Sequence, residues 1–188
     1  FLLIFSMFSV LFPGQGSQSV GMARDLYENF NYVKEFFNQA DEALNLSISK
    51  IIFDGPLDKL SQTENTQPAI FLVSYAFFEV IKKETSFEIG NASFFAGHSL
   101  GEYSALACSG VISFVETIKL LKIRGEAMQS ALPKNEGGMV AVLGEKIKKI
   151  EDIIENNKSK FNCFLANDNS NGQVVVSGKN LELEKLLT

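Results

Sequence analysis

The stretch Gly-His-Ser-Leu-Gly at residues 97–101 decides the fold, because it joins a short apolar run to a helical segment. The run at 93–96 is apolar enough for a buried strand, and residues 102–108 favour a helix that ends before Gly110. The pattern Gly-x-Ser-x-Gly between a strand and a helix is typical of a nucleophile elbow, a tight turn that exposes the serine hydroxyl. The sequence therefore predicts that Ser99 attacks a substrate.

An alternative role for Ser99 is that of an ordinary N-cap, the commoner use of serine before a helix. A nucleophilic serine also needs a base to take its proton. His98 is the one histidine of the chain. Adjacent residues at a tight elbow point in different directions, so we expect His98 to pack or hydrogen-bond beside the elbow and not to serve as the base.

The rest of the chain alternates apolar strands with helical stretches, which favours an α/β fold with a mainly parallel sheet. Pro68 is expected in the first turn of its helix, where its missing N–H costs little. Ser113 and Glu116 have the spacing of a capping box, for a helix that runs to about Ala131. The other expected elements are a first core strand at 9–12 and helices at 24–44 and 68–83.

After Pro133 the pattern becomes strand, helix, strand, strand, helix. This order is most of a ferredoxin-like unit, without its closing strand. We therefore expect a large α/β subdomain at 1–136 and an incomplete ferredoxin-like small subdomain at 137–188. The expected elements are strands at 138–143, 163–166 and 173–177, with helices at 145–156 and from about 181.

Composition is consistent with a globular protein and excludes some classes. Of the 188 residues, 46% are hydrophobic and 21% are charged, enough to bury a core. The net charge of −5, without a basic run, argues against a nucleic-acid partner. Cys108 and Cys163 lack the spacing of a zinc site, so we expect two buried thiols and no metal.

The amino-terminal stretch 1–12 is apolar but too short to span a bilayer. No Lys or Arg precedes it, as a signal peptide would require. We expect residues 1–6 to precede a start at Met7, and we expect a cytoplasmic protein without a membrane partner.

Four motifs together resemble the malonyl-CoA:acyl carrier protein transacylase family, from about Ser9 to the end of the chain. They are GHSLGEYSAL at 97–106, FPGQGSQ at 12–18, TQPA at 66–69 and the pair Arg124-Gly125. The acyltransferase domains of polyketide synthases share most of them. The resemblance implies malonyl transfer from malonyl-CoA to acyl carrier protein in fatty acid biosynthesis, through an ester on a serine and without a metal or redox cofactor.

An oxyanion hole needs two donors aimed at the developing negative charge. The residue after an elbow serine supplies one backbone N–H, which indicates Leu100. The resemblance assigns the second to the backbone N–H of Gln15. Two alternatives for this loop remain, a plain glycine-rich turn and a dinucleotide-binding loop, although Ser19 stands where the latter needs its third glycine.

Arg124 borders the apolar stripe of its predicted helix, where an arginine can simply extend its charged head into water. The resemblance instead implies that Arg124 binds the free carboxylate of the malonyl group, a task suited to a planar bidentate donor. Gln67, Met128 and Asn169 also match positions near the pocket of the family.

The family takes its base from a histidine that would follow residue 188. We therefore expect this stretch to be catalytically incompetent by itself. Two other hypotheses remain. One is a different serine acyl enzyme such as a lipase or esterase, which has no use for Arg124, and the other is a non-catalytic chain that retains ligand or carrier binding.

Overall fold

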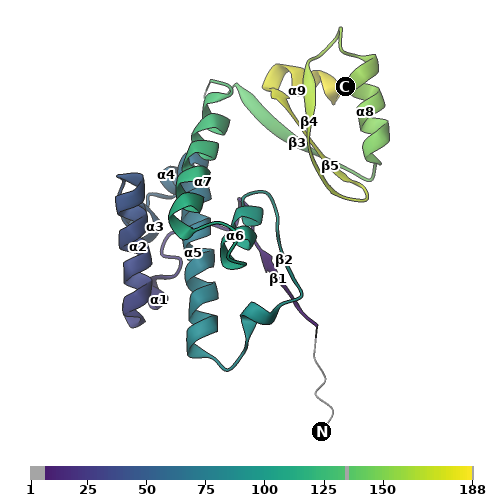
Figure 1. Cartoon of the computed structure of the whole chain (residues 1–188). Coiled ribbons are helices and arrows are strands. Elements are labelled where there is room, and N and C mark those ends of the chain that lie inside the picture. The colour runs from purple at the N-terminus through teal and green to yellow at the C-terminus, as the bar shows by residue number, and fades with distance from the viewer. Residues whose placement is uncertain (1–6, 134–135, 188) are drawn as a thin grey trace. The chain divides into compact units, whose positions relative to one another are not determined.

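The computed structural model describes residues 7–133 and 136–187. The chain divides between Gln129 and Ser130 into two units, each described by itself below (Figure 1). The prediction for residues 1–6 falls outside the described residues. In the described part, no helix is both long enough and apolar enough to cross a membrane.

Strands β1 (Ser9–Phe12) and β2 (Phe94–Gly97) of the first unit lie side by side and run in the same direction. Phe12 stands opposite Gly97 at the carboxyl ends of the pair. The loop after β1 and the turn after β2 therefore leave the sheet at the same end. The strand predicted at 9–12 is confirmed, and the one predicted before the serine turn is found with its bounds shifted by one residue.

Helices make up most of the first unit (Figure 1). Their apolar faces share a core in which Phe37, Ile52, Phe71 and Leu121 are fully buried. The helices are α1 (Arg24–Asn29), α2 (Asn31–Leu44), α3 (Ile48–Asp54), α4 (Leu57–Leu60), α5 (Thr63–Glu84), the 3₁₀ helix η1 (Ile89–Asn91), α6 (Leu100–Cys108) and α7 (Phe114–Ser130).

The single helix predicted at 24–44 is wrong, because Phe30 divides it into α1 and α2. Phe30 is extended, with φ −124° and ψ 115°. The side chain of Asn29 donates to the carbonyl of Asp25 at 2.8 Å, a local bond of the kind that competes with helix continuation. Phe30 is partly buried and packs against the core.

The predicted start of the next helix is also wrong. Helix α5 begins at Thr63, and Pro68 lies inside it and not in its first turn. Because Pro68 has no N–H, one carbonyl near the helix start has no helical donor. The Thr66 hydroxyl donates to the carbonyls of Leu60 and Gln62, at 2.6 and 3.0 Å, and so ties the first turns to α4. This earlier start makes the segment around Gln67 helical.

The capping box predicted for α7 is confirmed. The N–H of Glu116 donates to Ser113 Oγ at 3.2 Å, and the N–H of Ser113 donates back to the Glu116 carboxylate at 3.3 Å. These bonds satisfy N–H groups that the helix leaves without partners.

The second unit contains an antiparallel sheet of order β3-β5-β4, with α8 and α9 packed against it (Figure 1). Ile150, Ile154, Val174, Val176 and Leu183 form most of its core. The predicted order of elements is confirmed. The division into domains at 136/137 stays a prediction. The bounds are β3 (Gly137–Leu143), α8 (Ile147–Asn156), β4 (Cys163–Ser170), β5 (Gln173–Lys179) and α9 (Asn180–Leu186).

Candidate active site

Ser99 stands in the turn between β2 and α6, in an unusual backbone conformation. Its φ of 54° and ψ of −113° place it in a region that non-glycine residues rarely adopt. Ser99 occupies the N-cap position of α6, yet its side chain makes no capping hydrogen bond. The capping alternative therefore does not explain the serine, and strain of this kind clusters at functional sites.

The glycines that flank Ser99 are required by close backbone approaches. A Cβ built on Gly97 would stand 2.1 Å from the carbonyl group of Gly101. A Cβ on Gly101 would stand 2.5 Å from the carbonyl oxygen of Phe12, at the end of β1. Only glycine at both positions lets the strand, the turn and the helix meet, which fixes the serine against both strands.

Arg124 reaches the serine from α7. Its Nη2 donates to Ser99 Oγ at 3.0 Å, and its Nη1 donates to Gln67 Oε1 at 2.5 Å. Arg124 is half-buried beside the fully packed Gly125, so its predicted position at the margin of the apolar face is confirmed. Its guanidinium is directed toward Ser99 and Gln67. The alternative role would instead have it extend into solvent.

Gln67 holds that guanidinium in place. It is fully buried on α5, and besides accepting from Arg124 it donates through Nε2 to Met128 Sδ at 3.2 Å. Helices α5 and α7 approach closely here, because a Cβ on Gly125 would stand 2.6 Å from Glu64 Cα. The pair Arg124-Gly125 thus combines the charged group with the small residue that lets it reach α5.

Tyr103 is a site residue that the sequence analysis missed. The Arg124 guanidinium lies 5.7 Å from the centroid of its ring. Tyr103 follows Ser99 by one turn of α6, so helical spacing from the serine could have indicated it.

The loop at 13–23, which we call the glutamine loop, begins beside the serine turn. A Cβ on Gly14 would stand 2.8 Å from His98 Nδ1, so the two segments touch. Gln15 is exposed, and its Nε2 donates to Thr63 Oγ1 at 3.3 Å, at the start of α5. The first turns of α5 thus make two contacts. Thr63 contacts the glutamine loop, and Gln67 contacts Arg124.

Leu100, the other expected oxyanion donor, is the first residue of α6 and its side chain is buried. Because it follows Ser99 directly, its N–H is at the amino end of the helix, where backbone donors lack helical partners. Positive electrostatic potential from the helix dipole favours an anion at this end.

A profile of the acyl transferase domain matches residues 9–188. The chain belongs to the acyl transferase domain family. The predicted resemblance is confirmed.

The chain is similar to proteins that carry more specific names. The malonyl CoA-acyl carrier protein transacylase of Bacillus subtilis (strain 168) is 41% identical over 181 residues, which are 95% of this chain and 56% of that relative. The chain therefore spans about half the length of the curated relatives it matches.

Solved structures agree in fold. The acyl-carrier-protein-S-malonyltransferase of Bartonella henselae matches with a TM-score of 0.86 and 43% identity, covering 96% of this chain and 58% of that one. A second, with a TM-score of 0.84 and 37% identity, covers 96% of this chain and 58% of that one. It is a malonyl-transacylase in complex with its type II polyketide synthase acyl-carrier protein. The α/β class predicted from the sequence is thereby confirmed.

The remaining candidate groups of the chain are one asparagine and two cysteines. Asn169 lies on β4 in the second unit, where it donates to Gln173 Oε1 at 3.3 Å, and its match to the family pocket stays a prediction. Cys163 is buried and Cys108 only partly so. Burial, together with the charge of Glu79, raises the pKa of the Cys108 thiol to about 12, which keeps it protonated and poorly nucleophilic at neutral pH. Within the described ranges, no three His, Cys, Asp or Glu side chains are grouped to hold a metal ion.

Proposed function

We propose that the protein containing this chain transfers the malonyl group from malonyl-CoA to acyl carrier protein, through an ester on Ser99, in fatty acid biosynthesis. The observation that carries the proposal is the 3.0 Å contact between Arg124 Nη2 and Ser99 Oγ in a strained turn. It combines a nucleophile with a group that binds carboxylates. The names of the relatives support the same substrates.

In the first half of the reaction Ser99 Oγ attacks the thioester carbon and loses its proton to a base. The turn then acts as a nucleophile elbow, and the N–H groups of Leu100 and Gln15 stabilise the oxyanion. The C–S bond breaks, and coenzyme A leaves as its thiol with the proton from the base. In the second half the phosphopantetheine thiol of the carrier gives its proton to the base and attacks the carbonyl carbon of the seryl ester. The bond between that carbon and Ser99 Oγ breaks, and the base returns the proton to the serine.

Arg124 selects the acyl group. A malonyl group carries a free carboxylate, and a guanidinium binds a carboxylate through two parallel hydrogen bonds. Gln67 already holds Nη1, so the guanidinium is oriented before substrate arrives. Binding of the carboxylate replaces the contact of Nη2 with Ser99 Oγ, which leaves the hydroxyl oxygen free to attack.

The base is a histidine that follows residue 188 in the family. His98 lies against Gly14 in the glutamine loop, and we assign it to support of the turn. Residues 1–188 alone are then expected to transfer malonyl groups very slowly.

The remaining features of the proposal concern the whole protein. The second unit is taken as part of a ferredoxin-like subdomain, with the boundary at 136/137 and the closing strand outside this stretch. The protein is expected to act in the cytoplasm on malonyl-CoA and acyl carrier protein. No metal or redox cofactor is needed for the steps above.

Arg124→Ala tests the proposal in the full-length protein. We expect the ratio of malonyl to acetyl transfer to fall about 10- to 100-fold, because charge-assisted hydrogen bonds contribute roughly 1.5 to 3 kcal/mol. Arg124→Lys should restore only part of the ratio, since an ammonium keeps the charge but not the bidentate geometry. Transfer of both acyl groups by all three proteins is the measurement. An equal loss for malonyl and acetyl would make Arg124 structural and would favour an esterase.

A further inference from the structure

The glutamine loop, residues 13–23, ends against the carboxyl end of α3. The N–H of Gly21 donates to the carbonyl of Ile52 at 2.8 Å. Val20 packs against Gly55, the residue that terminates α3, because a Cβ built on Gly55 would stand 3.1 Å from Val20 Cγ2. The far end of the loop is thus attached to a helix that takes no part in the proposed chemistry.

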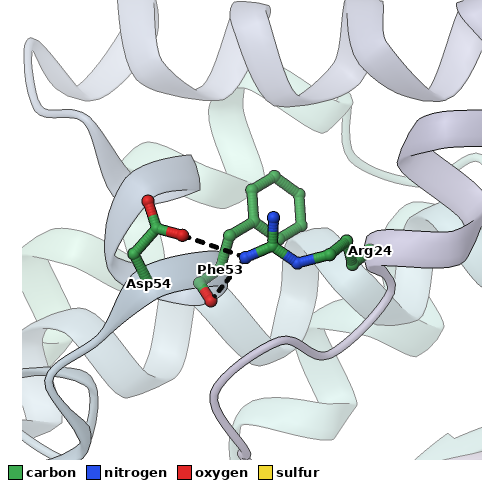
Figure 2. A network of polar contacts seen from close by, with 3 residues as sticks. All are labelled: Arg24, Phe53 and Asp54. Carbon is green, nitrogen blue, oxygen red and sulfur yellow. Dashed lines mark hydrogen bonds and ion pairs between the residues drawn. The ribbon is translucent and has the colours of Figure 1, made fainter.

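Arg24, the first residue after the loop, adds a third attachment (Figure 2). Its Nη2 donates both to the carbonyl of Phe53 at 2.7 Å and to Asp54 Oδ1 at 2.9 Å. Its guanidinium also lies 5.0 Å from the centroid of the Phe53 ring. Figure 2 shows both bonds leaving one nitrogen, with the ring of Phe53 beside the guanidinium.

These contacts amount to more than a surface ion pair. The side chains of Arg24 and Asp54 are 46% and 58% exposed, and such a pair alone contributes little. However, the Phe53 carbonyl belongs to the last turn of α3, where carbonyls lack helical donors. Asp54 adds a negative charge at the negative end of the same helix. One guanidinium, oriented by an aromatic ring, compensates both groups.

The loop needs such an anchor because its backbone is costly to hold. Gly16 and Gly21 have positive φ angles of 107° and 88°. Ala23, immediately before Arg24, has φ 58° without the freedom of a glycine. Some polar contacts in the middle of the loop are internal, such as Ser17 Oγ to the Gly14 carbonyl at 2.9 Å. Two others reach residues 61 and 63, from Gln18 Nε2 to Ser61 Oγ at 3.5 Å and from Gln15 Nε2 to Thr63 Oγ1 at 3.3 Å. They shape the loop but do not fix its end.

We propose that Arg24 is a positioning residue for Gln15. The start of the loop is fixed by the serine turn, where the N–H of His98 donates to the carbonyl of Phe12 at 3.3 Å. Its end is fixed on α3 by Arg24, and Gln15 lies between these two anchors. The inference rests on the proposed function, which gives the backbone N–H of Gln15 a place in the oxyanion hole.

The test is Arg24→Met in the full-length protein, a change that keeps a long side chain and a good helix former but removes every donor. We expect amide hydrogen exchange at 14–23 to become about 10-fold faster, with no change in α5 or α7. We expect kcat for malonyl transfer to fall about 10-fold, part of the loss that follows removal of an oxyanion donor. The KM for malonyl-CoA and the malonyl-to-acetyl ratio should stay within about twofold of wild type, since Arg124 sets them.

Two further variants sharpen the test. Arg24→Lys should recover part of kcat and of the exchange protection, because it keeps a cation at the end of α3. Lys148→Met makes the same kind of change on α8, where a more exposed cation pairs with Asp152 at 3.1 Å and with Glu151 at 3.7 Å, and it should change neither quantity.

Three results would overturn the inference: wild-type exchange of the loop in Arg24→Met, faster exchange throughout the first unit, or faster loop exchange with unchanged kcat. A wild-type protein that transfers no malonyl group would instead refute the proposed function. In that case the amide hydrogen exchange of the loop, without the kinetic measurements, would decide whether Arg24 holds the loop.

Discussion

The serine turn at 97–101 and the glutamine loop at 13–23 follow neighbouring parallel strands, but they are held in different ways. The turn is fixed by backbone contacts, with a Cβ on Gly97 standing only 2.1 Å from its neighbours. The loop has a backbone bond at its end, from Gly21 to Ile52, but it also depends on side-chain hydrogen bonds of Gln15, Gln18 and Arg24. The position of Ser99 is therefore set by the fold itself, whereas the position of Gln15, the proposed second oxyanion donor, depends in part on side chains that can be substituted.

The largest expected effect concerns the catalytic base, which neither segment provides. In the proposed mechanism the base is a histidine outside residues 1–188, so these residues alone should transfer malonyl groups several orders of magnitude more slowly than the full-length protein. Removal of a member of a catalytic triad usually has a cost of this size. Steady-state transfer rates of the two proteins are the measurement. Comparable rates would show that His98 or another group within this stretch activates the serine.

Gly97→Ala should test the rigidity of the turn. The added methyl group meets backbone atoms that cannot move separately, and we expect the free energy of unfolding to fall by at least about 3 kcal/mol. Urea denaturation of the full-length protein measures the change. Gly90→Ala is the matched control, because nothing lies within 4 Å of its Cβ position, and it should change stability by less than about 0.5 kcal/mol.

Gly16→Ala makes the corresponding change in the loop, and its effect should be smaller. Nothing lies within 4 Å of a Cβ at Gly16, so only its φ of 107° opposes the substitution. We expect a loss of about 1 to 2 kcal/mol, the usual cost of left-handed backbone for an L-residue. A destabilisation as large as that of Gly97→Ala would remove the difference between turn and loop.

The smallest effect is expected next to the turn on α6. Ser104 is fully buried, and its hydroxyl oxygen finds no hydrogen-bond partner in the part of the chain that the structure describes. An unsatisfied buried hydroxyl is unfavourable, so Ser104→Ala should raise the free energy of unfolding by up to about 1 kcal/mol. Thermal unfolding with unchanged transfer would support this, whereas destabilisation would mean that the hydroxyl has a partner.

Local patterns in the sequence were sufficient for much of the fold. The glycine spacing around Ser99 predicts the turn, and the spacing of Ser113 and Glu116 predicts a cap, because both depend on residues close in the chain. The break at Phe30 does not follow from the pattern, since it depends on packing against distant helices as well as on the local bond of Asn29. The start of α5 ahead of Pro68 was missed for a similar reason, because contacts with α4 outweigh the proline signal.

The site was predictable in its residue types but not in its contacts. Ser99 and Arg124 were singled out from motifs, whereas the bridge through Gln67 requires α5 and α7 to approach at Gly125. That approach is a property of tertiary packing, which no local pattern contains. Tyr103 is indicated only by its helical spacing from Ser99, and an exposed arginine such as Arg24 has no distinctive spacing at all.

The central claim is that Ser99 carries the acyl group. Brief incubation of the full-length protein with malonyl-CoA, without carrier protein, followed by peptide mass spectrometry tests it most directly. We predict a malonyl ester on Ser99, and its absence in a folded Ser99→Ala protein, because the hydroxyl contributes chemistry more than packing. A malonyl group on Cys108 or Cys163, or an adduct that persists in Ser99→Ala, would contradict the account.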